Sequence, residues 1–282
     1  MMNRRKVSFG SLALILSVLL YLCLLIIGPV IALISGAFES GPWLVIKSLT
    51  SPVLIKAFLL TLRIALLVVF VQTFFGTMIA WFFVRHEFLG KAFLNGLVDV
   101  PFAISPVVVG YMLLLLFGRN SPLFPLLERI NMRIAFASSG VFIATLFVCF
   151  PFMIREMIPV IESLDRGQEF AAATLGTNRW TIFWRIIFPQ LKSGLLYGMT
   201  LTFARAIGEF GAVFVVGGGV QGRTETVTLF IFRCIEERRH IEAYSAALLL
   251  GLFSVTIVFF ADWIKRLQLS KKRISLLEDS LI

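Results

Sequence analysis

The sequence has 282 residues, of which 59% are hydrophobic and only 15% are charged, and its mean hydropathy is +0.93. This composition excludes a soluble globular enzyme and predicts an all-α, polytopic integral membrane protein, because each helical span of a bilayer needs roughly 20 apolar residues. The net charge of +10 is spread over short segments with no long basic face, so we expect no nucleic acid partner.

Six apolar stretches predict six membrane-spanning helices. The first covers residues 12–34 and follows Arg4, Arg5 and Lys6. It is longer than the apolar core of about 7 to 15 residues in a signal peptide, which favours an uncleaved first span over a cleaved leader. The other five are expected at about residues 57–83, 96–117, 138–159, 194–216 and 244–264.

The third predicted span is interrupted. Asp99, Pro101, Ser105 and Pro106 lie in its first half, and each proline removes a backbone donor and disturbs the preceding turn. Such a break is tolerated inside a membrane where protein or a water-filled cavity meets the backbone. Ser105 is therefore a candidate residue of a transport pathway.

Basic residues set the expected orientation. With six spans, more Lys and Arg residues fall on the side of the two termini than on the other side, which indicates that both termini are cytoplasmic. Arg63, near the outer end of the second span, is expected to extend toward the lipid headgroups. The predicted division is an N-terminal span with an outer loop (1–56), a transmembrane domain (57–264) and a basic cytoplasmic tail (265–282).

Residues 166–190 predict a cytoplasmic helical hairpin between the fourth and fifth spans. Its first helix ends at Gly176, a residue that adopts a left-handed backbone without steric cost. Its second helix is expected to be capped by Thr177 and to end before Pro189. Trp180, Phe183, Trp184 and Ile187 then form one apolar stripe. The pattern alone suits either a helix lying on lipid or a helix docked on a partner.

The hairpin resembles the coupling loop of permeases from ATP-binding-cassette (ABC) importers. That loop reads Glu-Ala-Ala-x-x-x-Gly, then nine residues, then Ile-x-Leu-Pro, and this chain has Phe170-Ala171-Ala172, Gly176 and Ile186-x-Phe188-Pro189. Phe170 stands at the glutamate position, with Glu169 one residue earlier, and Phe188 replaces the leucine. The resemblance implies docking on a cytoplasmic ATPase through a surface that contains Glu169, Phe170, Ala171, Ala172, Gly176, Trp180 and Pro189.

A second resemblance is narrower and covers about residues 60–250. Residues 99–118, 149–160 and 195–226 look like the permeases of sulfate/thiosulfate and molybdate importers. This implies a bacterial inner-membrane subunit that imports an oxyanion, sulfate or thiosulfate first and molybdate or tungstate as the alternative. It further implies two ATPase subunits, a second permease that is either related or a copy, and a solute-binding protein. ATP and magnesium belong to the ATPase, and we expect no cofactor on this chain.

Arg205 and Glu209 lie four residues apart and share a face of the fifth span. They predict either an ion pair that satisfies two costly charges in the membrane, or a pathway site in which Arg205 attracts an anion and Glu209 limits its retention. Four glycines, Gly194, Gly198, Gly208 and Gly211, are expected to permit close helix packing across an interface between permeases.

The remaining motifs give less information about function. Residues 217–224 (GGGVQGRT) approach a phosphate-binding loop but have Arg223 where lysine is required and follow a membrane span, so we interpret them as an outer gate segment with Arg223 as a candidate anion contact. The cysteines and histidines have no metal-ligand spacing, and no catalytic constellation is visible. An ion-gradient secondary transporter is a less favoured alternative, because only Asp99, Arg205 and Glu209 are ionisable groups placed for it.

Overall fold

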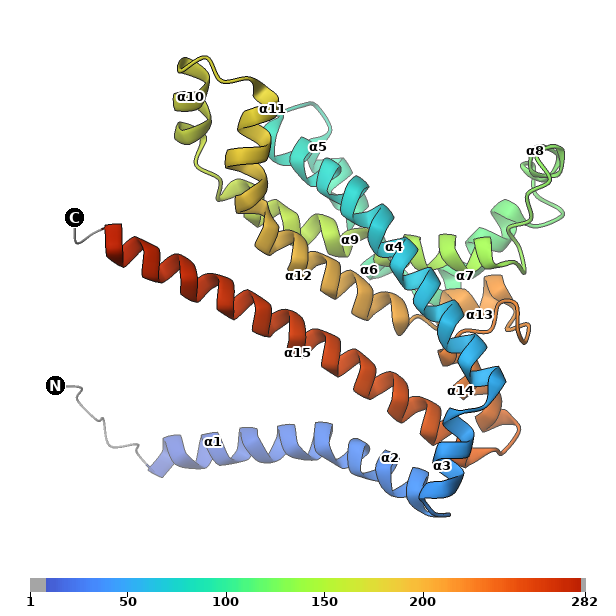
Figure 1. The fold of residues 1–282 in the computed structure, drawn as a ribbon. Helices are drawn as coiled ribbons and strands as arrows, with labels where there is room; N and C mark the ends of the chain where they lie inside the picture. Colours follow the sequence, from blue (N-terminus) through green and yellow to red (C-terminus); the bar gives the residue numbers. More distant parts are fainter. Residues whose placement is uncertain (1–8, 280–282) are drawn as a thin grey trace.

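The computed structural model describes residues 9–279, and every regular element in that range is helical, which confirms the all-α class (Figure 1). The charges Arg4, Arg5 and Lys6 lie outside the described residues. In chain order the elements are α1 (Phe9–Leu22), the π-helix η1 (Cys23–Ile27), α2 (Gly28–Phe38), α3 (Pro42–Leu49), α4 (Pro52–Arg85), α5 (Lys91–Val98), α6 (Val100–Ala103), α7 (Pro106–Phe117), α8 (Phe124–Arg129), α9 (Ser138–Glu162), α10 (Arg166–Thr174), α11 (Arg179–Ile182), the π-helix η2 (Phe183–Ile187), α12 (Phe188–Ile207), α13 (Gly211–Gly217), α14 (Val227–Glu236) and α15 (His240–Asp279).

The described chain has four helical segments long and apolar enough to cross a membrane, or five if one bent pair is counted. The four are Gly10–Phe38, Pro52–Arg85, Ser138–Glu162 and His240–Phe260, and the bent pair joins Arg179–Ile207 to Gly211–Gly217. A multi-pass membrane protein is thereby confirmed. The count of six remains a prediction.

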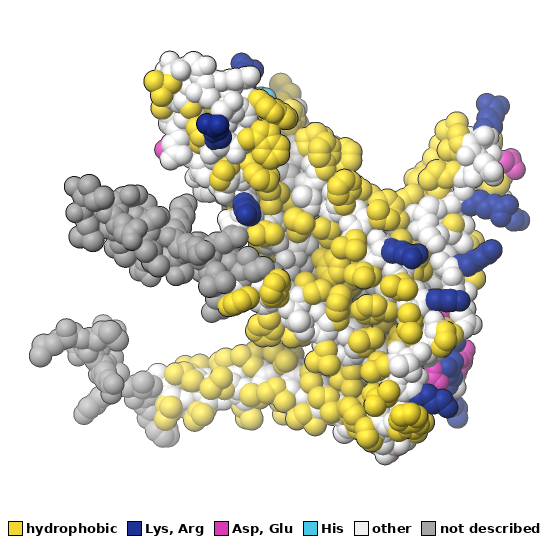
Figure 2. Space-filling view, viewed as in Figure 1, with side chains coloured by type: hydrophobic (Ala, Val, Ile, Leu, Met, Phe, Trp, Pro, Cys, Tyr) yellow, Lys and Arg dark blue, Asp and Glu magenta, His cyan; other side chains and the backbone are white. Residues whose placement is uncertain are grey.

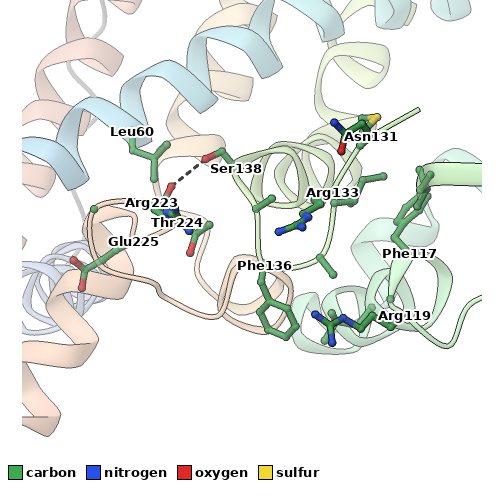
Figure 3. A pocket seen from close by; sticks show the side chains of 18 of the residues that line it. Leu60, Phe117, Arg119, Asn131, Arg133, Phe136, Ser138, Arg223, Thr224 and Glu225 are labelled. Carbon is green, nitrogen blue, oxygen red and sulfur yellow. Dashed lines mark hydrogen bonds between the residues drawn. The ribbon is translucent and has the colours of Figure 1, made fainter. Parts of the chain in front are cut away.

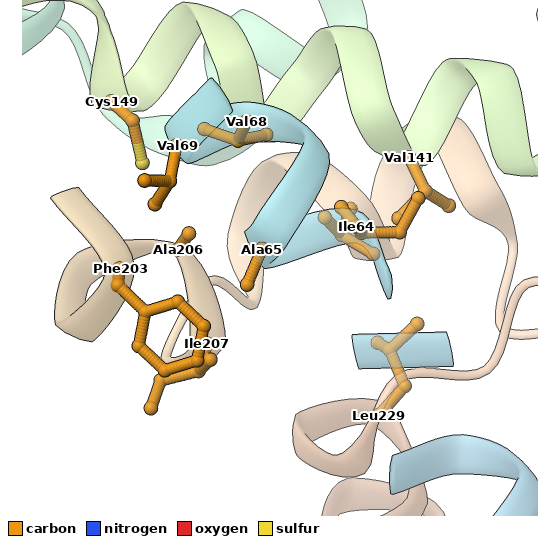
Figure 4. Packing of buried hydrophobic residues seen from close by; sticks show 11 residues of the cluster. Ile64, Ala65, Val68, Val69, Val141, Cys149, Phe203, Ala206, Ile207 and Leu229 are labelled. Atoms are coloured by element: carbon orange, nitrogen blue, oxygen red, sulfur yellow. The ribbon is translucent and has the colours of Figure 1, made fainter. Parts of the chain in front are cut away.

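The core lies where α4, α9 and α12 pack against one another (Figure 1). Figure 4 shows Val68 and Val69 of α4 beside Cys149 of α9, with Phe203 and Ala206 of α12 on the facing side. A polar side chain inside this core is satisfied, since Gln72 donates from Nε2 to the carbonyl of Leu146 at 3.0 Å. The three helices form the packed centre of the molecule.

Glycines permit this close packing. A Cβ placed on Gly198 of α12 would lie 2.6 Å from Sδ of Met153 in α9, and one on Gly194 would lie 2.6 Å from Cγ2 of Val160, also in α9. Gly211 is in contact with α7, where its Cβ would lie 3.1 Å from Val107. These glycines therefore permit close helix packing within the chain, and their expected role at an interface between two permeases stays a prediction.

The third predicted span is broken into α5, α6 and α7. Ile104 and Ser105 are extended between α6 and α7, and both prolines of this region stand in the first turn of a helix, where the missing N–H costs nothing. The predicted interruption is confirmed. Only α7 is strongly apolar, and its 12 residues extend about 18 Å, which is too short to cross a bilayer alone.

The fifth predicted span, residues 194–216, is bent in the structure. α12 ends at Ile207, α13 begins at Gly211, and the two are bent by 56°. The connection is stabilised by Glu209, whose backbone carbonyl accepts from Thr228 Oγ1 at 2.7 Å. The bend contains no proline, and tertiary contacts such as this hydrogen bond hold it instead.

The segment of residues 217–243, which separates the fifth and sixth predicted spans, contains α14. Leu229, Phe230 and Cys234 of this helix are buried, and it packs against α15 and α4. Its start is fixed to α4 by a hydrogen bond from the Val227 N–H to Thr61 Oγ1 at 2.9 Å. α14 is thus an amphipathic helix that buries one apolar face in the bundle.

The N-terminal helices α1 and α2 diverge from the bundle and expose apolar side chains along most of their length (Figures 1 and 2). Contact with the rest of the chain occurs between α2 and α15, where the ring of Tyr244 occupies the space over Gly36. Figure 2 shows that hydrophobic side chains also cover much of the bundle surface. Such a surface suits lipid or another membrane subunit.

Candidate coupling and pathway sites

The hairpin between α9 and α12 is shaped by local caps. Asp165 caps α10, and its Oδ1 accepts from the Gly167 N–H at 2.8 Å. At the other end the Gly176 N–H donates to Ala173 and the Thr177 N–H donates to Ala172, at 3.0 and 3.1 Å. This is a Schellman motif, and Gly176 has the expected left-handed backbone with φ of +77°.

The second arm of the hairpin differs from expectation in two respects. Asn178, not Thr177, caps it, because Asn178 Oδ1 accepts from the Trp180 N–H at 3.3 Å. The arm also does not end before Pro189. The π-turn of η2, closed by a bond from the Phe188 N–H to the Phe183 carbonyl, carries the helix into α12 with the proline in its first turn. The hairpin is therefore continuous with the core helix α12.

The outer surface of the hairpin is apolar. The side chains of Phe170, Leu175 and Trp180 are 67%, 85% and 68% exposed. The predicted stripe divides, because Ile187 is buried in the bundle whereas Trp180 and Trp184 face outward with their rings 6.0 Å apart. Large exposed aromatic side chains on a polar helical hairpin are typical of a docking surface.

Glu169 faces α4, whereas Phe170 faces away from the chain. It forms an ion pair with Arg85, the last residue of α4, and the Arg85 guanidinium lies 4.6 Å from the centre of the Trp81 ring. One residue along a helix turns the side chain by about 100°. The one-residue displacement of the glutamate therefore places a carboxylate against α4 and leaves Phe170 on the surface.

The remaining predicted hairpin residues also lie on or near this surface. Ala171, Gly176 and Pro189 are exposed, and Ala172 is half-buried against the cluster formed by the ends of α4 and α9. A Cβ on Gly176 would meet nothing within 4 Å, so no steric contact requires a glycine here. The left-handed backbone conformation is what favours glycine at this position.

Arg205 and Glu209 form the predicted ion pair, with Nη1 and Oε2 2.7 Å apart. The Glu209 side chain is 2% exposed and that of Arg205 is 29% exposed. The other carboxylate oxygen of Glu209 accepts from the Ala212 N–H at 3.0 Å, at the start of α13. The pair thus joins α12 to α13 across the bend and neutralises a buried carboxylate, although Oε2 accepts no hydrogen bond.

Arg223 lies at a large cavity, whereas Arg205 and Ser105 are not part of its lining. The cavity has a volume of about 1400 Å³ and lies among the ends of α4, α7 and α9, the helix α8 and the connection between α13 and α14 (Figure 3). Its lining includes five basic residues, Lys56, Arg63, Arg119, Arg133 and Arg223. Ser105 is exposed in the break before α7.

The segment of residues 217–224 is held by hydrogen bonds rather than forming an open loop. Thr224 Oγ1 donates to the Gly217 carbonyl at 2.6 Å and accepts from the Val220 N–H at 2.9 Å. Gly218, Gly219 and Gly222 take left-handed backbones that allow this tight turn. The turn presents Arg223 at the cavity.

The sequence singled out Arg223 but missed its four basic neighbours in the cavity. Arg63 was expected to extend to headgroups and lies in the cavity lining instead. Considered singly, each of these residues resembles the Lys and Arg residues that set the orientation of a membrane protein. The seven-residue spacing of Lys56 and Arg63, two turns of one helix face, was the one signal in the sequence that could have joined two of them.

Comparison with known proteins places this geometry in a family. A profile of the family described as "Binding-protein-dependent transport system inner membrane component" matches residues 72–274. That range contains the core helices α9 and α12, the hairpin between them, the bend beside Arg205 and nearly all of α15.

Several curated relatives are sulfate permeases. The chain is 45% identical over 255 residues to the sulfate transport system permease protein CysW of Synechococcus elongatus, covering 90% of this chain and 89% of that protein. It is 40% identical to the chloroplastic sulfate permease 2 of Chlamydomonas reinhardtii, covering 90% and 69%. It is 37% identical to CysW of Escherichia coli K12, covering 96% and 94%.

Solved structures share the fold at low sequence identity. A chain of a bacterial ABC transporter involved in the import of alginate superimposes with a TM-score of 0.75 at 17% identity, covering 90% of this chain and 94% of that one. A chain of the MetNI methionine ABC transporter in an inward-facing conformation gives 0.54 at 15% identity, covering 76% and 95%. The fold, the family profile and the curated relatives agree, and the chain belongs to the family of binding-protein-dependent transport system inner membrane components, which makes it a transport subunit and not an enzyme.

Proposed function

We propose that this chain is a permease subunit of an ABC importer and forms half of the pathway for sulfate, with thiosulfate as a second substrate. The observation that carries the proposal is the 45% identity to a sulfate permease over 90% of the chain. Relatives from an alga and an enterobacterium that are named as sulfate permeases support the same substrate.

The hairpin is the proposed site of coupling to the ATPase. Phe170, Leu175 and Trp180 expose apolar surface that needs a partner, and η2 joins them without interruption to the core helix α12. Movement of a docked ATPase would therefore be transmitted as tilting of α12 and of the helices packed on it, between inward-open and outward-open states. Glu169, Ala171, Ala172, Gly176 and Pro189 complete or shape this surface.

The proposed assembly has two permeases, two cytoplasmic ATPases and a solute-binding protein. The second permease is either a related chain or a copy of this one. The proposed location is the bacterial inner membrane with both termini cytoplasmic, so that the hairpin faces the ATPase and the basic cavity faces outward. ATP and magnesium are bound by the ATPase, and this chain binds no cofactor.

Three residues are proposed pathway contacts. Arg205 retains 29% exposure beside its buried partner Glu209, so part of its guanidinium is available to an anion. Ser105 is exposed at an interrupted helix, which is where a membrane protein presents polar backbone to a cavity. Arg223, at the cavity, is the third.

The test is reconstitution of the chain in liposomes with its ATPase, its second permease and its binding protein. Sulfate, thiosulfate, molybdate and tungstate are compared as stimulants of ATP hydrolysis. We expect sulfate and thiosulfate to stimulate. Stimulation by molybdate or tungstate alone would assign the chain to the alternative oxyanion class.

A further inference from the structure

The basic cavity and the coupling hairpin lie at opposite ends of the same helices. α4 lines the cavity near its start, at Lys56, and ends at Arg85, which pairs with Glu169 of the hairpin. α9 likewise begins at the cavity with Ser138 and ends at Glu162, just before the hairpin. At 34 residues α4 extends about 50 Å. The cavity is thus remote from the coupling surface and needs its own explanation.

Two cations reach the cavity from one helix face. Lys56 and Arg63 are two turns apart on α4, and Leu59 and Leu60 between them also line the cavity. Arg63 stands within α4, a helix long and apolar enough to cross a membrane. An arginine there is costly unless it faces water or a counter-charge, and the cavity provides the water.

Three further cations come from three different connections. Arg119 follows α7, Arg133 precedes α9, and Arg223 follows α13 (Figure 3). Two of them have their backbone carbonyls held by the first residues of α9, because Ser138 Oγ donates to Arg223 at 3.0 Å and Ser139 Oγ donates to Arg133. The arginines are therefore brought together by fixed loops.

The positive charge of the cavity is largely uncompensated. Within the described residues none of its five basic side chains forms an ion pair. Of its two acidic lining residues, Glu225 is already paired with Arg233 at 2.6 Å, and only Glu128 is left. The α9 N-terminus opens beside it with no side-chain cap, which adds a partial positive charge.

The neighbouring charges show that this is not a general property of this end of the molecule. Arg233 and Arg239 pair with Glu225, Glu237 and Glu242. Hydrogen bonds from Arg239 and Arg233 hold the pKa of Glu237 below its usual value, and the bond to Glu225 raises the pKa of Arg233. Arg233 and Arg239, outside the cavity, are thus neutralised, whereas the arginines that line the cavity form no ion pair with any described residue.

We propose that this cavity is an anion vestibule that gathers small tetrahedral dianions at the outer mouth of the permease. The choice of sulfate as the dianion rests on the proposed function. All five cations are exposed and the cavity is much larger than one anion, so attraction acts on hydrated ions through the summed field of the cleft. A conduit needs this combination, in which an ion is concentrated but not retained.

Site-resolved arginine modification tests the vestibule without requiring transport. The assembled importer in lipid nanodiscs, without binding protein, is treated with phenylglyoxal in sulfate or in chloride of equal ionic strength, and modified peptides are quantified by mass spectrometry. A dianion accumulates in a positive potential more steeply than a monoanion. We expect sulfate to slow modification of Arg119, Arg133 and Arg223 at least twofold relative to chloride and to leave Arg129, a neighbour on α8 outside the lining, unchanged.

Charge variants give a second readout. The triple variant Arg119→Gln, Arg133→Gln, Arg223→Gln should lower sulfate uptake by on the order of tenfold at low ionic strength with saturating binding protein, the low end of what a charged cleft contributes. The matching triple change to lysine should stay within about twofold of the parent, since focusing needs charge and not the guanidinium fork. The control Arg129→Gln should behave like the parent.

The proposal is overturned if sulfate protects no more than chloride, or if it protects Arg129 equally. It is also overturned if the glutamine triple variant only raises the concentration of binding protein needed for half-maximal uptake, because the cations would then serve protein docking. These results differ from failure of the proposed function, in which sulfate would not stimulate ATP hydrolysis whether or not it protects the arginines.

Discussion

Glu209 is buried where α12 bends into α13, and its two carboxylate oxygens have separate partners. Oε2 lies 2.7 Å from Nη1 of Arg205, and Oε1 accepts from the Ala212 N–H. Arg223 and its basic neighbours at the cavity have no such partner among the described residues. Arg205 and Arg223 are therefore arginines with different roles, and substitutions should distinguish them.

Glu209→Gln keeps the shape of the side chain and removes its charge. We expect a loss of about 1–3 kcal/mol in the free energy of unfolding, below the range for a fully buried pair because Arg205 is partly exposed. Thermal unfolding of the purified chain in detergent measures it. Glu237→Gln removes an exposed carboxylate from two ion pairs, with Arg233 and Arg239, and is the control that should leave the midpoint nearly unchanged. Equal shifts in the two variants would contradict the role of Glu209.

Arg85 and Glu169 should be energetically coupled, because their ion pair joins the end of α4 to α10 and is mostly shielded from solvent. A double-mutant cycle with Arg85→Gln and Glu169→Gln should give a coupling energy of about 1 kcal/mol in stability. The same variants should lower the stimulation of ATP hydrolysis by sulfate. Strictly additive effects on stability would show that the pair holds nothing together.

At the scale of elements, Gly176 sets the turn of the hairpin through its backbone. Gly176→Asn should be tolerated and Gly176→Val should cost at least about 1 kcal/mol, since asparagine accepts a left-handed backbone and a β-branched residue does not. Gly90→Val imposes the same strain at φ of +91° outside the hairpin. Only the Gly176 change should reduce sulfate-stimulated ATP hydrolysis, measured against basal hydrolysis; equal losses from the two would argue against coupling through the hairpin.

Helix packing gives a graded prediction. A Cβ at Gly140 would lie 2.2 Å from the carbonyl oxygen of Ile134, which is backbone, whereas one at Gly198 meets the flexible end of Met153. Gly140→Ala should therefore destabilise by about 1–3 kcal/mol, and more than Gly198→Ala. Gly251→Ala, on an open helix surface, should be neutral or stabilising. Thermal midpoints rank the three variants, and a ranking with Gly198→Ala as the most harmful would contradict the packing.

The sequence predicts well those elements that have a clear local pattern, such as a long apolar stretch or a pair of prolines. The apolar stretches at 57–83 and 138–159 correspond to α4 and α9. Pro101 and Pro106 predict the break before α7. No sequence pattern marks the bend at Glu209 or the burial of α14, because both result from contacts between segments distant in the sequence. The cavity was missed for the same reason, since Lys56, Arg119 and Arg133 come together only after folding.

At the scale of the whole molecule, the two ends of the bundle are specialised differently. One end presents the apolar hairpin on the continuation of α12, and the other presents the basic cavity at the starts of α4 and α9. α4 and α9 connect the two ends through the packed core. If the hairpin moves with a docked ATPase, as proposed, continuous packed helices connect it to the cavity end.

The most direct test of this account is uptake of radiolabelled sulfate by liposomes that contain the assembled importer. Uptake should require the binding protein, the ATPase and ATP together, and it should be lost when Phe170→Asp and Trp180→Asp remove the apolar docking surface while the chain still inserts in the membrane. Sulfate uptake that continues without the ATPase, or that follows an ion gradient alone, would contradict the account.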